Sequence, residues 1–251
     1  AVPRKSRTAA ERAAVVERKL ILGDCINALK SVPENSVDLI LTDPPFGMTR
    51  NEWDVMPDLT QMWETFERVL KPNGTVLIFA AGKFMGRLIC SNENHFKYSL
   101  IWKYEQGSDY LNCNRKPLTI HQEIIVFSGK AAYYKRTPFE IKKPYFEAHS
   151  DVHSTNYGRV KERTVTNNPT GERCPVTVFE CAKDRGLHPT QKPVKLLKWL
   201  IESYCPPGGT VCDPYMGSGS TGEAADEMGM DFIGVENNSE YYTTAVKRLN
   251  E

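Results

Sequence analysis

The chain has 251 residues, 40% of them hydrophobic and 25% charged, which is enough for one large domain or two small ones with a real core. Its 32 Lys and Arg nearly balance its 31 Asp and Glu, so the net charge of +1 excludes a uniformly basic coat for nucleic acid but permits a local basic patch. No apolar run reaches the ~18 residues of a membrane span and the first twenty residues lack the apolar core of a signal peptide, so we expect a cytoplasmic protein with no membrane partner.

Short apolar runs alternate along the chain with longer amphipathic stretches. Seven runs have the character of strands: residues 20–22, 37–42, 75–80, 99–103, 123–127, 210–212 and 232–235. Five stretches show helical spacing: residues 59–70, 83–89, 193–204, 221–228 and 238–249. Strands interspersed with helices predict an α/β doubly wound sheet.

One long stretch, residues 133–185, breaks this alternation. It is polar, shows little periodicity and carries 10 Lys and Arg against 7 Asp and Glu. Such a stretch inside a compact fold is typical of a functional insertion, and a solvated surface excursion is the alternative.

The seven cysteines include no Cys-x-x-Cys pair, so we expect free thiols in a reducing compartment. A metal site drawn from His149, His153, Cys174 and Cys181 is disfavoured, because their spacing is irregular and the surrounding stretch is polar. We therefore predict no bound metal.

The strand at 37–42 ends in a rigid tip, Asp43-Pro44-Pro45-Phe46. Proline lacks an N–H and fixes φ, so the tip offers carbonyl acceptors in a set geometry, to which Asp43 adds a carboxylate and Phe46 a flat apolar face. These groups suit a planar ring that bears an amino group. Acceptors that draw such an amine toward tetrahedral geometry localise its lone pair and aim it at an electrophilic methyl group. A plain turn at a strand end is the alternative.

A glycine loop follows the strand at 210–212. Gly217, Gly219 and Gly222 spell G-x-G-x-x-G at the start of a helix, where backbone amides can meet a ligand closely. The next strand ends in Glu236, which is placed to accept hydrogen bonds from ribose hydroxyls. The unit predicts a cofactor that contains adenosine, and NAD, FAD and S-adenosylmethionine all fit this pattern.

The place of this unit in the chain helps to choose among them. It begins near residue 210 and leaves one predicted strand after it, so the remaining strands would come from upstream, in a circularly permuted sheet. Asp213 stands directly before the loop, where a carboxylate would repel a pyrophosphate and favour a cationic or amino-bearing ligand.

Three motifs carry a resemblance to a known family. Asp43-Pro44-Pro45-Phe46, with the Trp53-Asp54 pair after it, resembles the catalytic motif of amino-methylating DNA methyltransferases. The stretch 213–222 resembles their S-adenosylmethionine loop, and His188-Pro-Thr-Gln-Lys-Pro193 resembles the segment before that loop. Their order is that of the beta class. The resemblance implies a Rossmann-like, doubly wound, seven-stranded mixed sheet of circularly permuted topology, with S-adenosylmethionine as cofactor and double-stranded DNA as partner.

The resemblance also implies residue roles. The catalytic residues would be Asp43, Pro44, Pro45 and Phe46, with Asp43 and the Pro44 carbonyl accepting from the target amine and Phe46 stacking on the base. The cofactor residues would be Asp24, Thr190, Lys192, Asp213, Tyr215, Gly217, Ser218, Gly219, Glu236 and Asn237. Among these, Thr190 and Lys192 would hold the methionine carboxylate. Phe46 and Tyr215 depart mildly from the commoner Tyr and Phe of the family.

The resemblance further divides the chain into a basic N-terminal segment (1–19), a catalytic and cofactor-binding domain (20–132 and 186–251) and a target recognition region (133–185).

A base inside a duplex must be flipped out before it reaches a pocket. The candidate DNA contacts are Arg50, Trp53, Lys135, Arg136, Lys142, Lys143, Arg159, Lys161 and Arg163. Loop packing or a solvated surface is their alternative role.

Several functions stay open at this point. Aspartate at position 43 favours N6 of adenine over N4 of cytosine in the family, and N4-cytosine methylation is the first alternative. A nicotinamide oxidoreductase that uses the same glycine pattern, and a DNA-binding module without catalysis, are two others. The family also suggests a bacterial or phage-infected cell, a cognate restriction endonuclease and a homodimer.

Overall fold

The computed structural model describes residues 16–48, 54–149, 153–154, 158–159, 164–184 and 191–250. The described residues of the ranges 1–135 and 177–251 form one compact unit, and those of the range 136–176 form a second. The second unit lies within the range 133–185, and its role in target recognition stays a prediction.

The main sheet has eight strands in the order β1-β12-β11-β2-β3-β5-β4-β10. They are β1 (Arg18–Leu22), β2 (Val37–Thr42), β3 (Leu70–Ala80), β4 (Phe96–Ser108), β5 (Thr119–Ser128), β10 (Val178–Glu180), β11 (Thr210–Asp213) and β12 (Asp231–Glu236). β5 runs antiparallel to its neighbours β3 and β4, and every other pair is parallel. The predicted mixed, permuted sheet is confirmed.

The predicted count of seven strands was wrong by one. All seven predicted strands are present, and the eighth, β10, pairs with β4 at the edge of the sheet. β10 is three residues long and buries Phe179 alone among them, so it is too short for an alternating pattern to reveal it. It also lies in the polar stretch, where we expected no strand.

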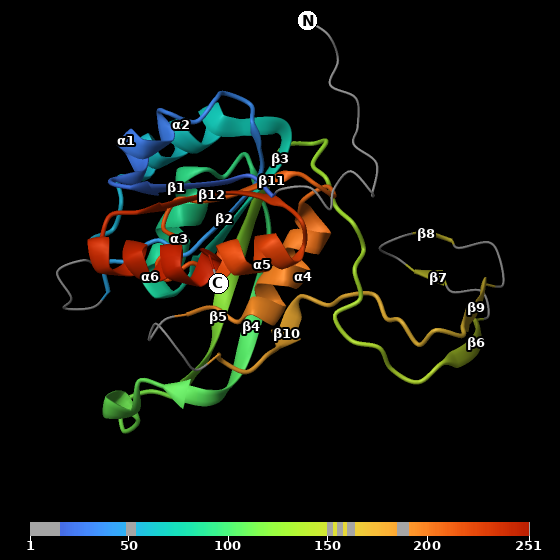
Figure 1. The fold of residues 1–251 in the computed structure, drawn as a ribbon. Helices are drawn as coiled ribbons and strands as arrows, with labels where there is room; N and C mark the ends of the chain where they lie inside the picture. The colour runs from blue at the N-terminus through green and yellow to red at the C-terminus, as the bar shows by residue number, and fades with distance from the viewer. Residues whose placement is uncertain are drawn as a thin grey trace, which may run out of the picture. The chain divides into compact units, whose positions relative to one another are not determined.

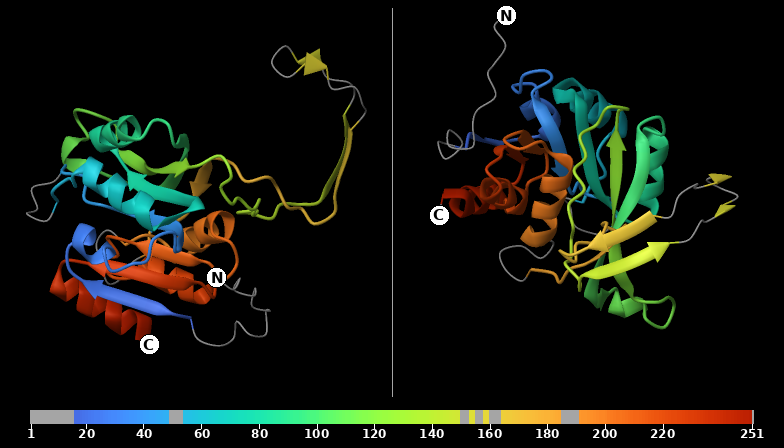
Figure 2. Two further views of the ribbon diagram at one scale, coloured as in Figure 1. Left: turned by 90° about the horizontal axis from the view of Figure 1, so that it is seen from above. Right: turned by 90° about the vertical axis from the view of Figure 1, so that its right-hand side faces the viewer.

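Helices cover both faces of this sheet (Figures 1 and 2). They are α1 (Cys25–Leu29), α2 (Leu59–Val69), α3 (Gly82–Ser91), α4 (Val194–Tyr204), α5 (Ser220–Glu227) and α6 (Ser239–Asn250). On one face α1, α2 and α3 bury Leu29, Phe66 and Phe84 against the strands. On the other face α4, α5 and α6 lie side by side. The five predicted helices are confirmed, and α1 was missed because five residues are too few to show helical periodicity.

The second unit contains short paired strands. β6 (Tyr145–His149) pairs antiparallel with β9 (Thr164–Asn168), and β7 (His153–Ser154) pairs with β8 (Gly158–Arg159). The Arg173 guanidinium lies 4.0 Å from the centre of the Tyr145 ring, a cation–π contact within the unit. The polar stretch is thus partly ordered as strands, although its sequence shows little periodicity.

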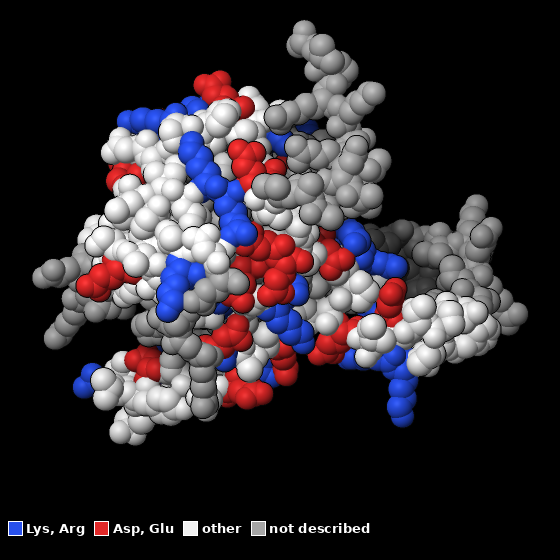
Figure 3. Space-filling view, in the orientation of Figure 1, with Lys and Arg blue, Asp and Glu red and all other residues white. Residues whose placement is uncertain are grey.

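Acidic and basic side chains are interspersed over the part of the main unit seen in Figure 3, as the near balance of charge leads one to expect. Among the described residues, no helix combines the length and the apolar run that a bilayer crossing requires. All seven cysteines are free thiols, as predicted.

The order of the strands determines where a site can form. β11 and β2 are neighbours at the centre, and the chain leaves them in opposite directions along the sheet, β11 toward β12 and β2 toward β3. A ligand crevice forms where the connections of a doubly wound sheet diverge, at the carboxyl ends of the strands. Thr42 at the end of β2 donates from Oγ1 to Asp213 at the end of β11, at 2.7 Å. This buried bond joins the two strand ends at the predicted crevice.

Candidate active site

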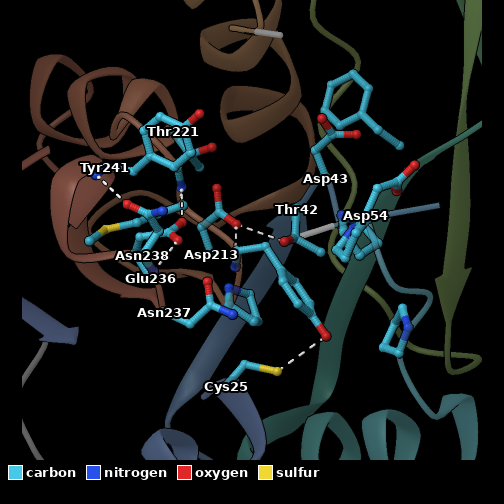
Figure 4. A pocket seen from close by; sticks show the side chains of 18 of the residues that line it. Cys25, Thr42, Asp43, Asp54, Asp213, Thr221, Glu236, Asn237, Asn238 and Tyr241 are labelled. Carbon is cyan, nitrogen blue, oxygen red and sulfur yellow. Dashed lines mark hydrogen bonds between the residues drawn. The ribbon is translucent and has the colours of Figure 1, made fainter. Parts of the chain in front are cut away.

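A cavity of about 510 Å³ opens at this edge of the sheet, within the range of small-molecule sites. The stretches that line it include residues 42–46 at the end of β2, residues 213–218 at the end of β11, and residues 236–238 at the end of β12 (Figure 4). The catalytic motif and the glycine loop therefore share one cavity, although about 170 residues of chain separate them.

The glycine loop forms one wall of this cavity. Gly217 has a φ of +52°, and a Cβ there would have no neighbour within 4 Å, so a ligand can approach its backbone closely. Gly219 has a φ of +82° and is the N-cap of α5, but a Cβ there would lie 3.1 Å from the Cβ of Ala245 on α6. Gly217 thus serves the cavity, whereas Gly219 serves the packing of α5 against α6.

Glu236 ties this loop to the end of β12. Its carboxylate accepts from the amide of Gly217 at 2.9 Å and from the amide of Asn238 at 2.8 Å, one bond on each oxygen. A carboxylate has about four lone-pair sites, so each oxygen can still accept from a ligand hydroxyl. Glu236 is therefore fixed in place and keeps the acceptor capacity predicted for ribose.

Asp213 is buried where the two walls meet. It accepts from Thr42 and, at 3.1 Å, from the amide of Tyr215. Burial raises its pKa to about 6, although hydrogen bonds from Thr221 and Thr42 oppose this shift. A carboxylate buried in this way gains from a cationic ligand group, because a positive charge offsets the cost of its desolvation.

The tip after β2 forms the facing wall. The Asp43 carboxylate accepts from the ammonium of Lys192 and, at 3.4 Å, from Nε2 of Gln122. Phe46 stacks on Phe84 of α3 with ring centres 5.0 Å apart and planes 19° apart, and it also lines the cavity. One face of Phe46 is therefore fixed by packing beside the carboxylate.

Asp54 holds the chain that leaves this tip. Its two carboxylate oxygens accept from the amides of Gly47 and Met48, at 2.8 and 2.9 Å. Gly47 has a φ of +65°, which favours glycine, so the turn after Phe46 is defined by one glycine and one buried acid.

The opposite end of the cavity lies beside α1. Asp24 caps this helix by accepting from the amide of Asn27 at 3.1 Å, and it lines the cavity. Cys25 donates from Sγ to the Tyr215 hydroxyl at 3.1 Å, which joins α1 to the glycine loop. Burial raises the pKa of both the Cys25 thiol and the Tyr215 hydroxyl, so both stay protonated.

Some of the predicted contact residues lie outside the described part of the chain. These are Thr190 for the cofactor and, for DNA, Arg50, Trp53, Lys161 and Arg163, while Arg159 is described through the backbone of β8. Their roles stay predictions.

The predicted DNA contacts that are described have a range of partners. Lys135 forms an ion pair with Glu202 at 2.7 Å, and Arg136 donates to Sγ of Cys174 at 3.7 Å. Lys142 and Lys143 are exposed in the second unit. In the described ranges no cluster of three potential metal ligands is present.

Sequence reasoning missed several residues of the site. Thr42, Gln122 and Phe79 had no motif to mark them, because each acts through its place in the sheet. Asp54 lies in the Trp53-Asp54 pair of the catalytic motif, but we assigned it no role. Gln191 stands in the segment before α4 and lines the cavity, and its buried Oε1 has no hydrogen-bond partner among the described residues.

Comparison with known proteins identifies the family. The family model described as DNA methylase, for N6 and N4 methylation, matches residues 37–247, which include both walls of the cavity. The chain belongs to the N6/N4 DNA methylase family. As a DNA methylase it acts on DNA and takes its methyl group from S-adenosylmethionine.

Two curated relatives match almost the whole chain. The DNA adenine methyltransferase YhdJ of Escherichia coli (strain K12) is 30% identical over 250 residues, covering 93% of this chain and 83% of YhdJ. The type II methyltransferase M.HpaI of Haemophilus parainfluenzae is 28% identical over 250 residues, covering 94% of this chain and 75% of M.HpaI.

Solved structures show the same fold. A complex of M1.HpyAVI with S-adenosylmethionine aligns with a TM-score of 0.65 at 24% identity, covering 92% of this chain and all of that one. The PvuII DNA methyltransferase, which is named as cytosine-N4-specific, aligns with a TM-score of 0.69 at 17% identity, covering 92% of this chain and 86% of that one.

The cavity of this methylase fits its cofactor. Glu236 offers acceptors for ribose hydroxyls, and Gly217 leaves open space beside its backbone. Buried Asp213 suits the ammonium group of a methionine moiety.

Proposed function

We propose that this protein is an N6-adenine DNA methyltransferase in which residues 43–46 receive a flipped-out adenine and the wall of Gly217 and Glu236 binds S-adenosylmethionine. The observation that carries the proposal is the shared cavity, which the tip and the glycine loop line from opposite sides. Because methyl transfer needs donor and acceptor in contact, two separate pockets would not serve it.

When bound, S-adenosylmethionine supplies an electrophilic methyl group on a sulfonium. The protein's part is to hold the target amine in line with that methyl group. The Asp43 carboxylate and the Pro44 carbonyl accept the two N–H bonds of the adenine amine. These bonds draw the nitrogen toward tetrahedral geometry, so that its lone pair leaves the ring and points across the cavity. Phe46 holds the plane of the base. Asp43 stabilises the positive charge that develops on the nitrogen as the bond from sulfur to the methyl carbon breaks, and the nitrogen then loses one proton along its hydrogen bond to Asp43 and on to solvent.

Adenine is favoured over cytosine by two observations. Position 43 is aspartate, as in the family's adenine-specific motif. The relative YhdJ, at 30% identity, is named as a DNA adenine methyltransferase. The two target bases both present an exocyclic amine to the same acceptors, so the choice between them depends on the part of the pocket that surrounds the ring.

The experiment is incubation with methyl-labelled S-adenosylmethionine and mixed-sequence duplex DNA, followed by digestion and analysis of the nucleosides. We expect label in N6-methyladenine, and sequencing of the modified positions then gives the recognition site. Label in N4-methylcytosine would refute adenine specificity while leaving the family intact. An Asp43→Ala variant serves as the control that ties any label to this cavity.

The second unit, residues 136–176, is our candidate for reading the DNA sequence, within the recognition region 133–185. Deleting or exchanging this unit should change which sites are methylated. A cognate restriction endonuclease, a homodimer and a place in the bacterial cytoplasm stay predictions.

A further inference from the structure

Two side chains from distant parts of the chain hold the carboxylate of Asp43. Lys192 stands two residues before α4 and donates from Nζ to Oδ2, while Gln122 on β5 donates from Nε2 to Oδ1 at 3.4 Å. Each oxygen of the carboxylate therefore has its own donor, and both donors lie far downstream of Asp43 in the sequence, 149 and 79 residues away.

Lys192 is buried around this contact. Its side chain is 9% exposed, compared with 26% for that of Asp43, and its ammonium lies 4.9 Å from the centre of the Phe79 ring on β3. Burying an ammonium is costly unless it is paired, and the Asp43 carboxylate provides that pairing. The lysine is thus enclosed at the edge of the sheet, whereas the exposed part of the carboxylate faces the cavity that both residues line.

The pairing leaves Asp43 able to accept from a substrate. A carboxylate has about four lone-pair sites, of which Lys192 and Gln122 occupy two. A carboxylate held by one bond can rotate about its χ2 angle, but a bond on each oxygen fixes its plane. A fixed plane aims the remaining lone pairs in set directions, and a misplacement of about 1 Å can cost roughly a hundredfold in rate.

We propose that Lys192 and Gln122 are positioning residues that fix the orientation of the Asp43 carboxylate for the target amine. The proposal rests on the proposed function, because it assigns Asp43 as the acceptor of that amine. It adds to the role that the family resemblance implies for Lys192, which is to hold the carboxylate of the cofactor. An ammonium has three N–H donors, so one lysine can serve both carboxylates.

Measuring binding and transfer separately distinguishes the two roles. Lys192→Met keeps the length of the side chain and removes its charge and donors. Lys198→Met, at a partly exposed lysine of α4 paired with Glu227, is the matched control. We would measure S-adenosylmethionine affinity by calorimetry, DNA affinity by fluorescence anisotropy, and the single-turnover rate of methyl transfer with both ligands saturating.

We expect Lys192→Met to lower the saturated single-turnover rate roughly a hundredfold, and Lys198→Met to leave it unchanged. A cofactor role alone predicts the reverse pattern, with weaker S-adenosylmethionine binding and a normal rate once the cofactor saturates. That result would overturn the positioning role of Lys192.

Gln122→Leu provides a second test that does not depend on the buried lysine. Leucine has nearly the same volume but no donor, and nothing in the proposal places Gln122 against the cofactor. We expect a roughly tenfold loss of the saturated rate at unchanged cofactor and DNA affinity, because one of the two bonds that hold the carboxylate remains. A normal rate in a folded Gln122→Leu protein would overturn the role of Gln122.

The proposed function and this inference fail in different ways. If the wild-type protein transfers no methyl group to DNA, or if Asp43→Ala still does, the proposed function is wrong. If the wild type methylates DNA and depends on Asp43, but Lys192→Met and Gln122→Leu keep the saturated rate, the inference alone is wrong.

Discussion

The two walls of the cavity are built in different ways. In the cofactor wall, residues 213–221 with 236–238, the bonds come mostly from nearby residues: Asp213 accepts from Tyr215, and Glu236 accepts from Asn238 and Gly217. The exception is Thr42, 171 residues away, which also donates to Asp213. In the catalytic wall, residues 43–46, the bonds to Asp43 come from residues 79 and 149 positions away. The first wall is thus held mainly within one βαβ unit, with one bond from β2, whereas the bonds to Asp43 come from β5 and from the segment before α4. Distant changes should therefore affect methyl transfer more readily than cofactor binding.

The largest effect should come from the acceptor of the catalytic wall. Asp43→Asn keeps the shape of the side chain and removes its charge. We expect the single-turnover rate of methyl transfer to fall by roughly a thousandfold, because the transition state loses its charged acceptor. The affinity for S-adenosylmethionine, measured by calorimetry, should change less than threefold. Equal loss of binding and transfer would show that the carboxylate is structural and that the two walls are not separable.

The cofactor wall should show the opposite pattern. Glu236→Ala removes the acceptors proposed for ribose and the anchor of the Gly217 amide. Since hydrogen bonds to charged groups contribute about 1.5–3 kcal/mol each, we expect roughly a hundredfold loss of S-adenosylmethionine affinity. Glu240→Ala, in the first turn of α6, is the control and should bind normally. Normal binding by Glu236→Ala would contradict the placement of the ribose.

Replacing Asp54 tests how far the catalytic wall depends on the turn that follows Phe46. Asp54→Ala leaves the amides of Gly47 and Met48 without their acceptor, so the turn after Phe46 should loosen. We expect about a tenfold loss of the saturated transfer rate with normal cofactor affinity. Asp58→Ala removes the N-cap of α2 and should lower stability by about 1 kcal/mol without lowering the rate. A full rate in Asp54→Ala would show that the tip keeps its form without this acid.

Asp213 should give the smallest effect, and one that depends on pH. Its pKa is raised from 3.8 to about 6 by burial, so the acid is increasingly protonated below pH 6 and loses its attraction for an ammonium group. S-adenosylmethionine affinity should therefore weaken several-fold from pH 7 to pH 5, and Asp213→Asn should remove this dependence. An unchanged pH profile in Asp213→Asn would mean that Asp213 does not face the ligand's cationic group.

Ionisation of Asp213 should also change the stability of the free protein, but stability should change with pH in the opposite direction to cofactor affinity. A raised folded-state pKa means that Asp213 favours folding below pH 4, and that this contribution is lost as the pH rises through 6. The shift of about two units corresponds to roughly 3 kcal/mol at most. Relative to the wild type, Asp213→Asn should therefore gain thermal stability as the pH rises from 4 to 7.

The contrast between the walls also explains what the sequence could predict. The strand, glycine loop and acidic tip at 210–236 follow one another in the chain, so their pattern indicated both the βαβ unit and its ligand class. The sequence shows Asp43-Pro44-Pro45-Phe46 as a motif, but it does not show which distant side chains bond to Asp43. Gln122 reaches Asp43 because β5 lies beyond β3 in the sheet, and that strand order is not written in any local pattern.

The same reasoning applies to the elements that were missed. α1 has five residues and β10 has three. Both are too short for the spacing of their apolar residues to indicate a helix or a strand. β10 forms because β4 offers an unpaired edge, which is a property of the folded sheet.

The most direct test of the shared cavity is a crystal structure of the protein with S-adenosylmethionine bound. We predict that the ribose hydroxyls bond to Glu236, that the methionine moiety passes Gly217 and Asp213, and that the methyl group points across the cavity toward Asp43. A cofactor bound away from the glycine loop, or one whose methyl group points away from Asp43, would contradict the account.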